Sequence, residues 1–263
     1  MNKLRAISLS LVAACLATAA PVHAGNSSPS VFETLPASEP PKKGWEFGFQ
    51  MYGWASDIGG HADIAGTRQE IDFPISDILD HLDMTVMVTA LAKKDRFTFL
   101  ADYIYLKMSG DQFLSGPLFG YKKTALRMHL LNLIGTYRIW ENHCAFIELG
   151  GGARYLGNEV EVHLNSGIAA PRYLRIKTDS WNAVGAIRAG YDFNEKWGIR
   201  GYFDIGGGDA DITWLANLAL HYKIRENTSL VLGYRYLFFD ISQGTNGIEL
   251  DVSGPYLGAA FNF

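Results

Sequence analysis

The final stretch of the chain, residues 247–263, alternates between two kinds of residue. Phe261 and Leu257 share one set of positions with other non-polar residues, whereas Asn262 and Gly258 fall in the interleaved set of small, polar or amphipathic ones. A two-residue period is typical of a β-strand whose two faces meet different surroundings. Because such a strand also needs neighbours for its backbone, this stretch constrains the fold of the whole chain.

The same alternation recurs from Gly44 onward and predicts nine further strands. In the first of them, Trp45 shares one face with three other apolar residues and Glu46 lies on the opposite face. The nine strands are expected at residues 45–51, 84–93, 97–105, 122–140, 145–154, 181–192, 197–205, 214–223 and 230–238. No run approaches the roughly 18 consecutive apolar residues of a membrane-spanning helix. We therefore expect about ten strands, and the short connections at 206–211 and 243–247 leave eight or twelve as alternatives.

A closing strand that ends on the aromatic Phe263 resembles the last strand of bacterial outer-membrane β-barrels. With residues 232–236 (LGYRY) as support, residues 44–263 resemble the small Gram-negative barrels of the OmpA and opacity type. The resemblance implies an all-β, closed, antiparallel up-and-down transmembrane barrel whose last strand pairs with the first, so that lipid meets no open edge. It also implies recognition of Phe261 and Phe263 by the barrel-insertion machinery, and contact with outer-membrane lipid and lipopolysaccharide.

The chain begins with a segment that is typical of a secretory signal. Lys3 and Arg5 precede an apolar run with small residues at its end, so we interpret residues 1–24 as a signal peptide that exports the protein. An alternative is lipidation at Cys15, which follows a sequence similar to a lipoprotein cleavage site. Residues 25–43 are rich in Ser and Pro without a sustained period, and we expect a flexible periplasmic tail there.

Charge and cysteine content argue against nucleic acid as a partner and against a disulfide within the mature chain. The formal net charge is −4, and removal of the two basic residues of the signal makes it more negative, which argues against nucleic acid. Cys144 is the only cysteine that follows the signal, so no disulfide is expected within one mature chain. Asp209 and Asp211 are an isolated acidic pair, which is weak support for a Ca²⁺ site. We expect no cofactor and no metal.

The connections differ in length. Those near residues 94, 141, 194 and 226 are short and polar, whereas residues 59–83, 110–121 and 158–173 are expected to form long loops. Short turns at the periplasmic end and long loops outside are typical of this class of barrel.

Residues 71–83, within the first long loop, depart from the two-residue period. Ile75, Ile78, Leu79 and Leu82 recur at helical spacing, and Pro74 or Ser76 is a suitable start for a short helix. Such a helix could enter the lumen as a plug, lie over the mouth of the barrel, or pack only within its own loop.

Two polar residues conflict with the outward phase of the fourth strand. Arg127 and His129 share the positions of Leu131 and Leu133, which are expected to face lipid. Either both residues lie at the lipopolysaccharide headgroups, or a β-bulge around Leu130 reverses the phase.

The inward phases supply acidic and basic residues that we expect to form a lumen charge network. Its members are Glu46, Asp102, Glu148, Arg154, Arg188, Arg200, Asp204 and Arg235. Because a small barrel has an interior about wide enough for its own side chains, we expect these charges to pair across the lumen. The alternative is the lining of a narrow aqueous path.

The sequence therefore favours a barrel with a largely packed polar lumen and a structural or surface-interaction role. A narrow porin-like channel for small solutes is the alternative. An enzyme is not expected, because no histidine follows Asp209 and Asp211 as it would in the acidic sites of omptin proteases, and the later histidines lack a suitably spaced serine. The oligomeric state stays open.

Overall fold

The structure, a computed structural model, describes residues 44–263 apart from 65–66, 114–118, 167–171 and 244–245. The expected signal peptide at 1–24, with Cys15, and the expected tail at 25–43 lie outside the described residues. The strands of the described part are β1 (Glu46–Trp54), β2 (Asp57–Ile64), β3 (Thr67–Phe73), β4 (Leu82–Lys94), β5 (Phe97–Phe113), β6 (Phe119–Glu141), β7 (Ala145–Ser166), β8 (Arg172–Asp192), β9 (Trp197–Gly208), β10 (Ile212–Arg225), β11 (Thr228–Gln243) and β12 (Asn246–Asn262).

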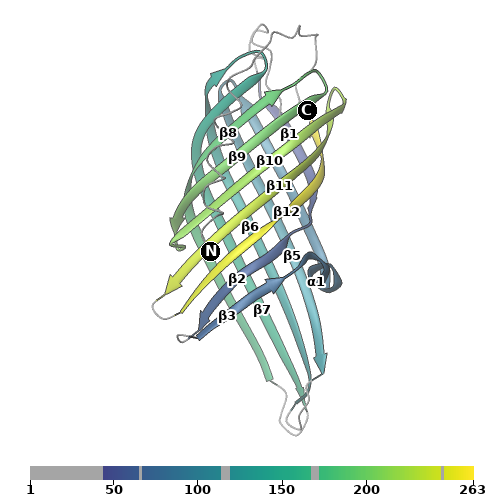
Figure 1. Ribbon diagram of the computed structural model, residues 1–263, viewed down its shortest axis with the longest axis vertical. Helices are drawn as coiled ribbons and strands as arrows, with labels where there is room; N and C mark the ends of the chain where they lie inside the picture. Colours follow the sequence, from purple (N-terminus) through teal and green to yellow (C-terminus); the bar gives the residue numbers. More distant parts are fainter. Residues whose placement is uncertain (1–43, 65–66, 114–118, 167–171, 244–245) are drawn as a thin grey trace, which may run out of the picture.

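Ten of these strands form a closed antiparallel barrel. From β4 to β12 each strand pairs with its neighbours in sequence, and β1 pairs with both β4 and β12 (Figure 1). The closing pair runs from Gly48 opposite Asn262 to Trp54 opposite Tyr256. The predicted fold class, the closing role of the last strand and the count of about ten strands are confirmed.

The last strand has two partners on the same edge. The half of β12 that ends the chain pairs with β1, and its first half pairs with β2, from Ser253 opposite Asp57 to Gly247 opposite Asp63. β3 continues the sheet by pairing with β2. The prediction of a long loop at residues 59–83 is therefore wrong, because the hairpin of β2 and β3 covers most of this range. β3 reads Thr-Arg-Gln-Glu-Ile-Asp-Phe, and such a polar segment gives a weak strand signal.

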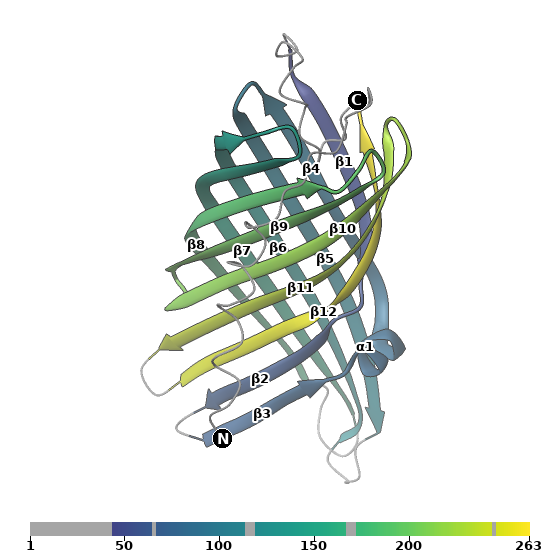
Figure 2. The same ribbon diagram turned by 45° about the horizontal axis from the view of Figure 1, so that its top comes forward.

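A short helix, α1 (Ile75–His81), follows β3. It begins after Pro74 and buries Ile78, as the helical spacing predicts, whereas Leu79 is exposed. Figures 1 and 2 both show α1 beside the barrel wall next to β5, so it is not a plug within the lumen. Within the described residues, no helix has both the length and the apolar character needed to cross a bilayer.

The two ends of the barrel differ. At one end, here called the turn end, short turns join the strands, and Asn142 and Asn194 each accept two backbone N–H groups through their side-chain oxygen. At the other, here called the hairpin end, β5, β6, β7 and β8 continue well past the ends of β9 and β10 (Figure 2). The predictions of long loops at residues 110–121 and 158–173 are also wrong, because these strands cover most of both ranges.

The outer surface follows the predicted phase. Phe47, Met51 and Leu257 are among many apolar side chains that are more than half exposed on it. The pairing of β6 with β5 is regular along its whole length, and its shifts against β7 lie only at residues 119–121 and 138–140. The bulge proposed around Leu130 is therefore absent from this part of the strand, and Arg127 shares the outward phase of Leu133.

The glycine run in β7 marks a close approach of two backbones. A Cβ added at Gly150 would lie 2.0 Å from the carbonyl oxygen of Gly135, and one at Gly152 would lie 1.8 Å from that of Leu133. Only glycine fits at these two positions, as the sequence indicates.

Candidate functional site: the buried charges of the lumen

Three fully desolvated carboxylates organise the interior of the barrel. The side chains of Asp102, Glu148 and Asp204 are 5%, 1% and 0% exposed and come from β5, β7 and β9. A buried carboxylate is stable only where hydrogen bonds and opposite charges replace its water. Each of the three is therefore described with the groups that surround it.

Glu148 lies between two arginines. Nη2 of Arg138 donates to Oε1 at 2.8 Å, and Nη1 of Arg188 donates to Oε2 at 2.6 Å. The hydroxyl of Thr136 donates to Oε2 at 2.9 Å and that of Thr98 to Oε1 at 3.2 Å. Both oxygens are thus fully used.

Asp204 and Arg154 form the most deeply buried ion pair, with both side chains 0% exposed. Nη2 of Arg154 lies 2.7 and 2.6 Å from the two carboxylate oxygens, and Nη1 donates to the hydroxyl of Thr213 at 2.8 Å. The Tyr202 hydroxyl also donates to Asp204, at 2.5 Å. These hydrogen bonds hold the Arg154 guanidinium and the Asp204 carboxylate in one relative orientation.

Asp102 accepts four hydrogen bonds. The donors are the hydroxyls of Tyr52 at 2.8 Å and Thr89 at 2.7 Å, the amide of Asn132 at 3.4 Å and Nη1 of Arg235 at 3.1 Å. The Arg235 guanidinium also lies over the Tyr52, Trp54 and Tyr256 rings, 5.0 to 5.7 Å from their centroids. Asn132 joins two of the groups, because its oxygen accepts Nε of Arg154 at 2.7 Å.

The eight residues expected in the lumen charge network do not all meet one another. Six of them form the three groups above, whereas Glu46 and Arg200 pair with residues outside the expected set. Glu46 lies 3.8 Å from Nζ of Lys93, and Arg200 donates to Asp192. Lys93 and Arg138 were missed, although both have the inward phase of their strands. Their signal was available, since Arg138 alternates with the outward Tyr137 and Ile139.

A second, apolar layer lies within the barrel nearer the hairpin end. Along β5, Asp102 is followed toward that end by Ile104; along β6, Asn132 is followed by Leu130; along β11, Arg235 is followed by Leu237 and Phe239. The buried residues of this layer include Trp54, Ile104, Leu130, Leu156, Leu237, Phe239 and Val252. A polar layer and an apolar layer therefore lie one after the other along the axis.

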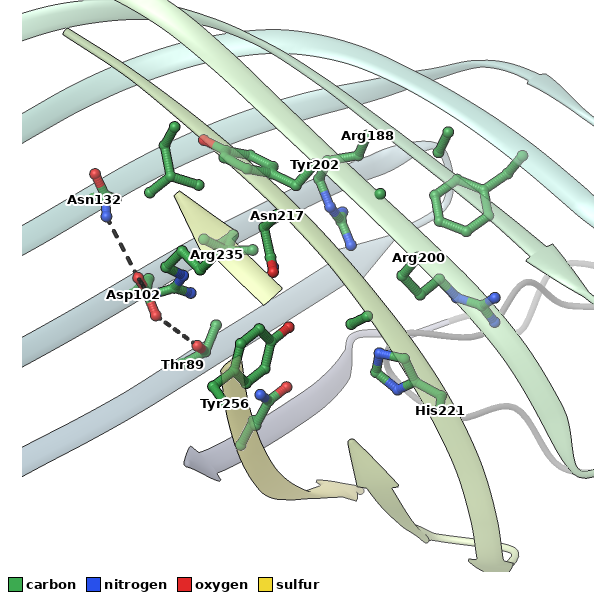
Figure 3. Close-up of a pocket in the computed structure, with 17 residues that line it drawn as sticks. Thr89, Asp102, Asn132, Arg188, Arg200, Tyr202, Asn217, His221, Arg235 and Tyr256 are labelled. Atoms are coloured by element: carbon green, nitrogen blue, oxygen red, sulfur yellow. Dashed lines mark hydrogen bonds and ion pairs between the residues drawn. The ribbon is translucent and has the colours of Figure 1, made fainter. Parts of the chain in front are cut away.

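A small cavity remains within the polar layer. Its volume is about 70 Å³ and its wall includes Arg188, Arg200, Asn217, His221 and Tyr256 (Figure 3). It is a pocket between side chains and is lined on several sides by the barrel wall.

The acidic pair near the hairpin end has structural roles. Asp209 accepts the backbone N–H of Trp181 at 2.7 Å, and Asp211 accepts that of Ser242 at 2.9 Å. In the described part of the chain, no three side chains of His, Cys, Asp or Glu gather as metal ligands would.

A ladder of ion pairs lies on the outer surface of the protruding strands. Nη1 of Arg127 on β6 lies 2.6 Å from Glu159 and 3.0 Å from Glu161 on β7, and Nη2 of Arg175 on β8 lies 2.8 Å from Glu159. Lys177 lies 3.2 Å from Glu159. The hydrogen bond from Arg175 is the main reason why the pKa of Glu159 falls from its ordinary 4.5 to about 2.

The chain ends on a pairing contact. The backbone N–H of Phe263 donates to the carbonyl of Phe47 at 2.9 Å, and Phe261 lies opposite Phe49 on β1 and Thr228 on β11. The Phe263 side chain is 81% exposed at the turn end.

The fold is shared with known barrels. No protein-family model matches the chain, and no curated protein sequence matches it. The crystal structure of the outer membrane protease OmpT from Escherichia coli is 9% identical with a TM-score of 0.58, and covers 86% of this chain and 99% of that one. Neisserial surface protein A (13%, TM-score 0.33, 82% and 97%) and Ail of Yersinia pestis (8%, TM-score 0.36, 84% and 99%) share less of their shape with it. With its closed ring of ten antiparallel strands, this chain has the fold of the small outer-membrane β-barrels of Gram-negative bacteria.

Proposed function

We propose that the protein is an integral outer-membrane barrel with a closed lumen, and that its role is structural or lies in surface interactions at the hairpin end. The observation that carries this proposal is the filled interior. A polar layer of paired charges and an apolar layer follow one another along the axis, so a solute would have to displace both.

The size of the remaining space supports the same proposal. At roughly 10–15 Å³ for each water, the 70 Å³ cavity holds on the order of five water molecules. An ion that left this cavity toward the hairpin end would meet Leu130, Leu237 and Phe239 and would lose its hydration.

The protruding strands β5 to β8 supply the surface that such a role requires. Tyr155 and Trp181 pack against each other on the outer face with ring centroids 4.8 Å apart, and the ion-pair ladder of Arg127, Glu159 and Arg175 follows toward the hairpin end. Aromatic residues at the lipid boundary followed by charges fit a surface that meets lipopolysaccharide headgroups. We propose that this face contacts outer-membrane lipid and lipopolysaccharide.

Planar-bilayer conductance tests the closed lumen. We expect no steady conductance from the wild type or from Arg127→Ala on the outer face. Arg235→Ala removes a buried guanidinium from the polar layer only, so it should also stay closed while Leu130, Leu237 and Phe239 remain in place. A large, stable wild-type conductance would overturn the proposal and favour a narrow channel for small solutes, which the cavity in the polar layer supports as the second candidate.

The proposed role is not enzymatic. The likeness to a protease is one of fold at 9% identity, and fold alone does not carry a reaction.

We also propose that Phe261 and Phe263 form the signal read by the barrel-insertion machinery. The pairing of both residues with β1 supports this, since they complete the last seam of the ring. Deletion of Phe263 should lower the amount of heat-resistant barrel recovered from the outer membrane, measured by gel mobility before and after boiling. Deletion within the tail, of residue Ser30, is the control. An undiminished yield without Phe263 would contradict the assembly role.

A further inference from the structure

The wall of the lumen cavity carries an excess of positive charge. Arg188, Arg200 and Arg235 line it together with one carboxylate, Asp102. Arg235 is paired with Asp102, and Arg188 is paired with Glu148, which does not line the cavity. Basic side chains therefore outnumber carboxylates in the wall of this space.

The buried side chains of the described lumen also include more cations than carboxylates. Six basic side chains are at least nine-tenths buried, against three acidic ones. The basic ones are Lys93, Arg138, Arg154, Arg188, Arg200 and Arg235, and the acidic ones are Asp102, Glu148 and Asp204. Their remaining partners, Glu46, Glu141 and Asp192, are 24–36% exposed near the turn end, where water screens them. Buried cations thus outnumber buried carboxylates in the described lumen, and a buried charge is costly where its counter-charge is screened by water.

Unused hydrogen-bonding atoms also surround the cavity. The Asn217 amide donates to the Tyr256 hydroxyl, while the Asn217 side-chain oxygen is buried without a hydrogen-bond partner. Nε of Arg235 is likewise buried with no such partner. Figure 3 shows the polar heads of Arg188, Asn217 and Tyr256 turned toward one space, whereas Arg200 points away from it. Orphaned groups of this kind are normally satisfied by a bound ion or ordered water.

We propose that the cavity binds a small inorganic anion of the size of chloride, together with ordered water. Arg188 and the Tyr256 hydroxyl donate to the anion, and an accompanying water donates to the oxygen of Asn217. The volume of about 70 Å³ admits a halide and a few waters but excludes a sugar or a nucleotide. The anion supplies the charge that the buried carboxylates lack, so the site stabilises the polar layer.

Two measurements on the full-length barrel in detergent test this site. The first is diffraction from crystals grown in sodium bromide, where we expect an anomalous peak between Arg188 and Tyr256. The second is the temperature at which gel mobility changes, in chloride and in gluconate at equal ionic strength. We expect a rise on the order of 3 °C for each tenfold increase in chloride above half-saturation, and no rise in gluconate.

A matched pair of variants separates the site from general salt effects. Asn217→Asp places a carboxylate beside the cavity and should abolish the chloride dependence, whereas Asn227→Asp makes the same change in an exposed turn and should retain it. If Asn217→Asp does not fold, the comparison of the wild type in chloride and in gluconate still tests the proposal. Equal transition temperatures in chloride and gluconate, or a bromide map with water alone in the cavity, would overturn the proposal. Both readouts report binding and not conductance, so this result is independent of whether the lumen is closed.

Discussion

The two layers of the lumen are held together by different interactions. In the polar layer, Arg154 and Asp204 hold each other through bonds of fixed direction, and both are fully buried. In the apolar layer, Leu130 and Phe239 fill space without directional bonds. Loss of one partner leaves an unpaired charge in the first case and a hole in the second. The polar layer therefore joins facing strands at fixed positions, and the apolar layer packs without such positions.

The largest effect should come from the most buried charge pair. Arg154→Ala leaves Asp204 buried without its guanidinium and should reduce the free energy of unfolding by about 4 kcal/mol. Urea unfolding in lipid vesicles, followed by tryptophan emission, measures this change. Arg127→Ala, in the exposed ladder, is the control and should cost far less. Equal losses in the two variants would show that burial does not separate the two kinds of ion pair.

A hole in the apolar layer should cost somewhat less. Leu130 is 1% exposed, and Leu130→Ala should reduce the free energy of unfolding by about 3 kcal/mol through lost burial and the cavity left behind. The matched control is Leu133→Ala on the same strand, where the side chain is 44% exposed on the outer face. The same urea titration applies. A loss at Leu133 as large as that at Leu130 would mean that the apolar layer is not a packed core.

The smallest effect should come from the exposed ladder. Because the pKa of Glu159 is depressed to about 2, its pairing contributes fully above its ordinary value of 4.5 and is lost as the pH falls through about 2. The small difference in stability between wild type and Glu159→Gln should therefore vanish between pH 4.5 and pH 2. Added salt should reduce it at neutral pH. A difference that persists at pH 2 would argue against the Arg175 contact as its source.

The sequence was sufficient for the strands that meet lipid. Each of them has apolar residues on its outer face, so the two-residue period located the starts of β5 at Phe97 and β9 at Trp197 and both ends of the closing strand, although β5 continues past Tyr105 to Phe113. The hairpin of β2 and β3 and the extensions of β7 and β8 were read as loops. In these segments both faces of a strand can be polar. Without an apolar face toward lipid, the alternation between apolar and polar residues becomes weak.

The alternation along each strand also predicted that most of the charged residues face the lumen, but it could not predict which of them form pairs. Which arginine meets which carboxylate depends on the stagger between strands, and facing residues are distant in sequence. Arg235 meets Asp102 across 133 positions, and Arg154 meets Asp204 across 50. The apolar layer was missed for a different reason. Leu130 and Ile104 lie on the inward phase, where a polar lumen led us to expect charge.

The two partners of β12 bear on the order in which the molecule can assemble. Residues 57–63, near the start of the described chain, are anchored on residues 247–253 near its end. β2 and β3 can pair locally with each other, but a two-stranded hairpin is only marginally stable alone. Its attachment to the wall must wait until the last strand has been made and placed. The segment that is translated early is therefore among the last to find its place, and until then both of its edges are open to a neighbouring chain.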